Sequence, residues 1–134
     1  MFRLSQKADY GLILLSSVAS AMEDRSSPFI SVASVANKNQ ISPKFLSQIA
    51  QELKHAGILA SREGVSGGYS LAKSANEIKL LDVLKILDGE LVEGKCFEEG
   101  HECTCGAGEM WVEMKKQMEE TIGKKTVADL VATI

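Results

Sequence analysis

The chain has 134 residues, of which 45% are hydrophobic and 25% are charged. This length and balance are typical of a soluble globular protein with one modest core, and they exclude a fibrous or low-complexity chain. No apolar run approaches the ~18 residues of a membrane span, and the first residues lack the apolar core of a signal peptide. We therefore expect a cytoplasmic protein without a membrane partner.

The formal net charge of -3 is unevenly distributed. Residues 1–75 carry eight Lys and Arg against five Asp and Glu, whereas residues 76–134 carry seven against thirteen. An acidic chain argues mildly against nucleic-acid binding. The basic half can nevertheless face phosphates while the acidic half faces away.

Three helices and a hairpin are predicted in the first half. Apolar residues at helical spacing predict a helix over residues 5–22, with Ser5 as its N-cap. Residues 23–30 are polar, contain proline and predict a loop, after which Ser31 caps a short helix. Ser42 and Pro43 are typical of a third helix start. Segments 58–62 and 69–72 enclose a glycine-rich turn and predict a two-stranded hairpin.

The second half predicts further helices separated by an acidic loop. An amphipathic helix over residues 80–87 ends at Asp88 and Gly89, and residues 90–108 form a loop that holds every cysteine. From Glu109, apolar residues recur every four positions and predict a helix with a core or dimer face. These residues are Met110, Met114, Met118 and Ile122. Residues 126–129 have capping-box spacing and predict a short last helix.

The predicted fold class is mostly α with a small β-hairpin. The order of the elements predicts a winged helix-turn-helix DNA-binding domain over residues 1–75. Residues 76–134 would then supply a linker helix, the cysteine loop and a long C-terminal dimerisation helix. A helical bundle with an incidental hairpin is the structural alternative.

In a winged helix, the start of the third helix and the hairpin tip contact double-stranded DNA. The amide of Gln48 suits adenine, and Lys44 suits a phosphate or guanine. The predicted DNA-binding residues are Ser42, Pro43, Lys44, Phe45, Gln48, Arg62, Ser66 and Gly67. We find no nucleophile elbow, phosphate-binding glycine loop or zinc-protease motif, so we predict that the protein is not an enzyme.

Cys96, Cys103 and Cys105 lie within ten residues of one another. An odd number of thiols does not indicate a disulfide framework, and clustered thiolates suit an iron–sulfur cluster or zinc. Three cysteines leave one ligand position open for His101, for a carboxylate from elsewhere or for a group of another protomer. Redox-active thiols without metal are the alternative.

Several motifs together resemble the IscR/NsrR-type (Rrf-two) family of winged helix-turn-helix regulators, and the resemblance covers nearly the whole chain. They are Arg3-Leu4-Ser5, Asp9-Tyr10-Gly11, Ile41-Ser42-Pro43-Lys44-Phe45-Leu46, Leu53-Lys54-His55-Ala56-Gly57-Ile58-Leu59, Gly64-Val65-Ser66-Gly67-Gly68-Tyr69-Ser70-Leu71-Ala72, Leu81-Asp82-Val83 with Asp88-Gly89, and the interval from Cys105 to Trp111.

The resemblance implies a homodimer on a palindromic operator, with the long C-terminal helix joining the protomers. It also implies an iron–sulfur cluster on the three cysteines, whose loss or modification alters DNA affinity. Cys96 and Cys105 match the family positions, whereas Cys103 does not stand where the middle cysteine usually does. The loop is also shorter than in the iron–sulfur biogenesis regulators.

The fourth ligand differs between branches of this family. The biogenesis regulators use a histidine where this chain has Gly108. The nitric-oxide sensors use an acidic residue from the other protomer, which Asp9 matches. Asp9 is thus predicted to complete the site in trans, with His101 as the competitor and a solvated carboxylate as the structural alternative. At the wing, Glu63 stands where many relatives carry arginine.

Three functions remain open at this point. The first is a repressor or activator that senses iron–sulfur status, nitric oxide or redox state through the cluster. The second is a cluster-free winged-helix regulator with a thiol switch. The third is a zinc-stabilised module that binds protein instead of DNA.

Overall fold

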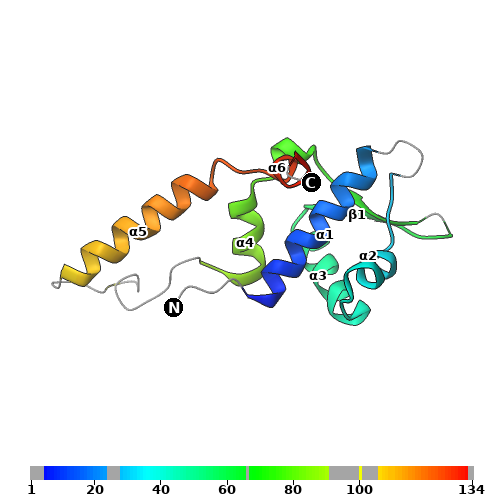
Figure 1. The fold of residues 1–134 in the computed structure, drawn as a ribbon, viewed down its shortest axis with the longest axis horizontal. Coiled ribbons are helices and arrows are strands. Elements are labelled where there is room, and N and C mark those ends of the chain that lie inside the picture. Colours follow the sequence, from blue (N-terminus) through cyan, green and yellow to red (C-terminus); the bar gives the residue numbers. More distant parts are fainter. Residues whose placement is uncertain (1–4, 24–27, 66, 91–99, 101–105, 133–134) are drawn as a thin grey trace.

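The computed structural model describes residues 5–23, 28–65, 67–90, 100 and 106–132. The chain is mostly helical with one antiparallel hairpin, which confirms the predicted fold class (Figure 1). In chain order the elements are α1 (Gln6–Glu23), α2 (Val32–Asn39), α3 (Pro43–His55), β1 (Leu59–Arg62), β2 (Gly68–Leu71), the 3-10 turn η1 (Ala75–Glu77), α4 (Leu80–Asp88), α5 (Gly106–Ile122) and α6 (Val127–Ala132).

Helices α2 and α3 are each capped at the N-terminus by a serine side chain, as the sequence predicted. The Ser31 hydroxyl accepts the backbone N–H of Ser34 at 3.1 Å. The Ser42 hydroxyl accepts the N–H of Phe45 at 3.4 Å, and Pro43 occupies the first helical position. Each cap satisfies a backbone donor that the first turn leaves without an intrahelical partner.

The turn between α2 and α3 depends on Gln40, which has a φ of 57° and a ψ of 43°. This left-handed conformation reverses the chain directly after α2. Ile41 then inserts into the core and is only 7% exposed. The two helices are therefore held in a fixed orientation before α3 begins.

Two helix starts in the second half show how well local pattern predicts boundaries. Asp129 accepts the backbone N–H of Thr126 at 2.8 Å, which confirms the capping box at the start of α6. Helix α5, however, begins at Gly106 instead of the predicted Glu109. The apolar stripe on which the prediction relied starts only at Met110, so it could not show the glycine-containing first turn.

The hairpin has one strand-like neighbour that the sequence did not predict. Leu59 pairs with Leu71 and Arg62 pairs with Gly68 in β1 and β2. Ile30, placed in a loop by the sequence prediction, forms an antiparallel bridge with Tyr69. A Cβ at Gly68 would overlap the carbonyl oxygen of Ile30, so only glycine permits this close approach.

A single core joins the helices to the base of the hairpin. Buried apolar residues of α1, α2, α3, β1, β2, α4 and α6 contribute to it, so both sides of the predicted boundary at residue 75 share one core. Helix α1 runs through the middle of the body, while α5 extends away from it (Figure 1).

At the crossing of α1 and α4, Gly11 allows close packing, because a Cβ there would overlap Leu87. None of the helices in the described residues combines the length and hydropathy of a membrane span.

Candidate nucleic-acid interface

Helix α3 has one buried face and one exposed face. Leu46, Ile49, Ala50 and Leu53 are buried in the core. This burial turns the opposite face outward, and the exposed residues include Ser42, Pro43, Lys44, Gln48 and Gln51. The N-cap and first two turns of α3 therefore present a hydroxyl, an ammonium group and an amide to solvent. A helix of this kind fits the major groove of B-DNA, where such groups reach phosphates and base edges.

Phe45 is the predicted DNA-binding residue whose side chain is engaged in packing. Its ring is partly buried and meets the ring of Tyr10 edge-on, with centroids 5.7 Å apart and planes at 71°. A salt bridge of 2.7 Å between Lys7 and Glu52 joins the same two helices. These contacts between α1 and α3 set the orientation of the recognition face.

The wing carries the second group of predicted DNA-binding residues. Arg62 is exposed at the end of β1, and Val65 at the hairpin tip is fully exposed. Gly67 lies so close to the backbone that a Cβ would overlap the carbonyl oxygen of Arg62. Ser66 lies outside the described residues.

Sequence reasoning missed a partner of Arg62. The guanidinium carbon of Arg62 lies 4.1 Å from the centroid of the Phe29 ring, within the range of a cation–π contact. Phe29 belongs to the segment predicted as a loop. The sequence does show an aromatic residue, Phe29, next to Ile30. It does not show that Phe29 lies near the wing, because that proximity results from the bridge between Ile30 and Tyr69.

The predicted metal ligands are only partly within the described residues. Cys96, His101, Cys103 and Cys105 all lie outside them. Asp9 is described: it is exposed in the first turn of α1, and its carboxylate has neither a hydrogen bond nor an ion pair among the described residues.

The chain on either side of the cysteine loop is held to the body by polar contacts. At its start, the Ser5 hydroxyl donates to the carboxylate of Asp88, the last residue of α4. Beyond the loop, Lys85 of α4 lies 3.6 Å from Glu119, and Glu90 lies 3.4 Å from Lys115. These ion pairs join α4 and the short segment after it to α5.

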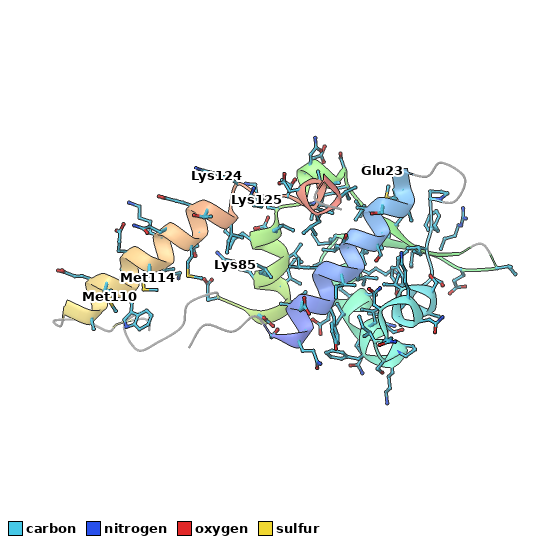
Figure 2. All side chains as sticks on the ribbon, in the orientation of Figure 1. Glu23, Lys85, Met110, Met114, Lys124 and Lys125 are labelled. Carbon is cyan, nitrogen blue, oxygen red and sulfur yellow. The ribbon has the colours of Figure 1, made fainter. Side chains whose placement is uncertain are left out.

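Helix α5 carries the predicted methionine stripe, and much of that stripe is accessible. Met110 is 52% exposed, while Met114, Met118 and Ile122 are partly buried. Figure 2 shows Met110 and Met114 on the part of α5 that extends away from the body. An apolar stripe on a projecting helix is typical of an interface between chains.

The match to known proteins extends over nearly the whole chain. The model of the Rrf2 family, described as "Iron-dependent Transcriptional regulator", matches residues 4–133. Protein rrf2 of Nitratidesulfovibrio vulgaris is 31% identical over 133 residues, which cover 96% of this chain and 87% of that protein.

Solved structures of two regulators share the fold. The structure of CymR, the global cysteine regulator of B. subtilis, is similar with a TM-score of 0.84 and 27% identity, covering 100% of this chain and 99% of that one. The structure of T. potens IscR has a TM-score of 0.80 and 27% identity, covering 98% and 87%. Both the family and these relatives are transcriptional regulators, which confirms the prediction that the protein is not an enzyme. The chain therefore belongs to the Rrf2 family of transcriptional regulators.

Proposed function

We propose that this protein is a homodimeric regulator that binds a palindromic DNA operator through α3 and the wing, and whose affinity responds to the state of its cysteine loop. The observation that supports DNA binding is the exposed face of α3 along its N-cap and first two turns. Ser42, Lys44 and Gln48 face solvent there, while Leu46 and Ile49 anchor the helix in the core. Family membership favours this function over the protein-interaction module. It also leads us to infer a cytoplasmic location, where genomic DNA is accessible.

DNA binding can be tested without knowing the operator, by selecting bound duplexes from a pool with a randomised central region. We expect enrichment of a two-fold symmetric sequence, because a symmetric dimer presents two copies of α3 to two half-sites. Fluorescence anisotropy with the enriched duplex should then show affinity that falls steeply with salt concentration. Binding that shows neither sequence enrichment nor salt dependence would contradict the proposal.

Helix α5 supports the proposal that the protein is a homodimer. The helix projects from the body (Figure 1), and the single chain leaves its methionine stripe incompletely buried, with Met110 52% exposed and Met114 partly buried. Covering this stripe with the same helix of a second protomer would remove the apolar surface from water. Sedimentation equilibrium of the purified protein would report the association directly.

The sensing part concerns a cluster held by Cys96, Cys103 and Cys105. Thiolates are the ligands that iron–sulfur clusters use, and the partner subunit's Asp9 would complete the set, with His101 as the competitor. In this structure Asp9 fits such a role because its carboxylate is exposed and has no other partner among the described residues. A bound cluster would supply a group sensitive to iron–sulfur status, nitric oxide or redox state.

Anaerobic purification followed by visible spectroscopy and assays of iron and acid-labile sulfide tests the cluster. We expect a coloured protein with comparable amounts of both elements, and loss of both in a Cys96→Ala variant. The Asp9→Ala and His101→Ala variants then distinguish the fourth ligand: the variant of the true ligand has a changed spectrum, and the other retains the parental one. An Asp9→Ala protein with an unchanged spectrum and unchanged cluster stability would contradict the Asp9 assignment.

A cluster-free thiol switch is the second candidate. It is favoured by the similarity to CymR of Staphylococcus aureus, whose structure has been solved in an oxidized form. A colourless protein after attempted reconstitution, with DNA affinity that changes reversibly on thiol oxidation, would establish this alternative. Zinc in the same protein, measured by metal analysis, would instead indicate a zinc-stabilised loop.

A further inference from the structure

Arg62 is the only cation in the wing sequence, residues 59–71, and its neighbour Glu63 carries a charge that repels phosphate. A long, exposed arginine side chain samples many rotamers, and ordering it on DNA costs conformational entropy. The wing therefore gains affinity from any contact that holds the guanidinium in place before DNA arrives. Phe29 makes such a contact, because its ring centroid lies 4.1 Å from the Arg62 guanidinium carbon.

The sheet itself brings these two residues together. Ile30 and Tyr69 exchange backbone hydrogen bonds of 3.0 and 2.8 Å, and Arg62 pairs with Gly68. Since side chains alternate along extended chains, Phe29 and Arg62 lie on the same face of the sheet. Gly68 lies on the strand between them and has no side chain to separate them.

We infer that Phe29 is a positioning residue for DNA recognition: its ring holds the Arg62 guanidinium at the wing so that the guanidinium edge can bind a backbone phosphate. A cation–π contact engages the face of the guanidinium, whereas phosphate binds a guanidinium through the N–H donors at its edge, so the two contacts use different parts of the group. This inference rests on the proposed DNA-binding function, and it assigns to the loop before α2 a part in that function.

The contact can first be tested without DNA. Protons on the Arg62 side chain that lie over the ring should resonate upfield in the NMR spectrum of the full-length protein. The Phe29→Leu variant should lose this ring-current shift, whereas Phe29→Tyr should retain it. An Arg62 spectrum that is the same with and without the aromatic ring would overturn the inference.

The role is then tested by anisotropy with the duplex enriched by selection. We expect Phe29→Leu to weaken binding about two- to fivefold, and Phe29→Tyr to bind like the parent. In an Arg62→Gln background, Phe29→Leu should have no further effect, because the group that it positions is gone. Lys124→Gln, which removes a cation at the junction of α5 and α6, controls for a general loss of positive charge (Figure 2).

The possible outcomes separate this inference from the proposed function. Equal losses from Phe29→Leu with and without Arg62 would show that the ring acts only through the fold, and would overturn the positioning role. Unchanged affinity in Phe29→Leu would overturn it as well. A parental protein that binds no duplex would overturn the DNA-binding function and this role with it, even where the ring-current shift demonstrates the contact.

Discussion

The hydroxyl of Ser5 lies 2.6 Å from both carboxylate oxygens of Asp88, although the two residues are far apart in sequence. The same hydroxyl accepts the backbone N–H of Ala8 at 3.0 Å, so Ser5 caps α1 and also ties it to the end of α4. Asp88 is thereby placed at the start of α1, where a helix dipole favours negative charge. Because the chain enters the cysteine loop just beyond Asp88, this contact joins the loop's first attachment point to the helix that carries Asp9.

Replacing Ser5 with alanine should lower the free energy of unfolding by about 1–2 kcal/mol, since the cap and the contact to Asp88 are lost together. Urea denaturation followed by circular dichroism measures this loss. Ser20→Ala, within the same helix, is the matched control and should be neutral or slightly stabilising because alanine has the higher helix propensity. Equal stabilities of the two variants would contradict the double role of Ser5.

Gly68→Ala should destabilise the wing by about 1–3 kcal/mol and abolish most DNA affinity. Gly68 has a φ of 142°, and a Cβ there would overlap Ile30, so strain and a steric clash act together. Gly64→Ala is the comparison, because Gly64 also has a positive φ of 111° but faces open space. If chemical denaturation shows the same loss for both variants, the close approach of Ile30 does not matter.

Substitutions on the exposed face of α3 should separate base recognition from phosphate binding. We expect Gln48→Ala to cost about 1–3 kcal/mol of affinity for the selected operator and to relax its sequence preference. If Lys44 contacts a phosphate, Lys44→Ala should instead weaken binding to all duplexes similarly. The slope of log affinity against log salt concentration should then fall by about one. Anisotropy titrations at several salt concentrations distinguish the two effects, with Lys124→Ala as the control. A Gln48→Ala protein with unaltered sequence preference would remove Gln48 from base recognition.

Introducing a charge into the apolar stripe of α5 should dissociate the proposed dimer. Met114→Glu places a carboxylate among Met110, Met118 and their symmetry mates, and burying an unpaired charge is strongly unfavourable. Sedimentation equilibrium should therefore shift toward the monomer. Lys116→Glu, on the opposite side of the helix, should leave the dimer intact. Dissociation by both variants would indicate an effect of net charge instead of an interface at the stripe.

Local features of the sequence determined most of the secondary structure. Ser31, Ser42 with Pro43, and the pair Thr126 and Asp129 mark helix starts because their side chains satisfy backbone donors a few residues away. The stripe of apolar residues in α3 predicted which face is buried, and hence that Lys44 and Gln48 are exposed. Such features depend on neighbours within one or two turns, so the sequence alone reveals them.

Tertiary structure alone decided which distant residues meet. The Ser5–Asp88 contact, the edge-on packing of Tyr10 and Phe45, and the position of Phe29 under Arg62 each join elements separated along the chain. None has a local signature: Ile30 approaches Tyr69 because Gly68 leaves room, and α6 packs against α1 from the opposite end of the chain. Non-local packing selects these pairs from many that local propensity permits equally. The sequence by itself therefore predicted a winged helix with an exposed recognition face, and the fold decided how that face and its wing are held in place.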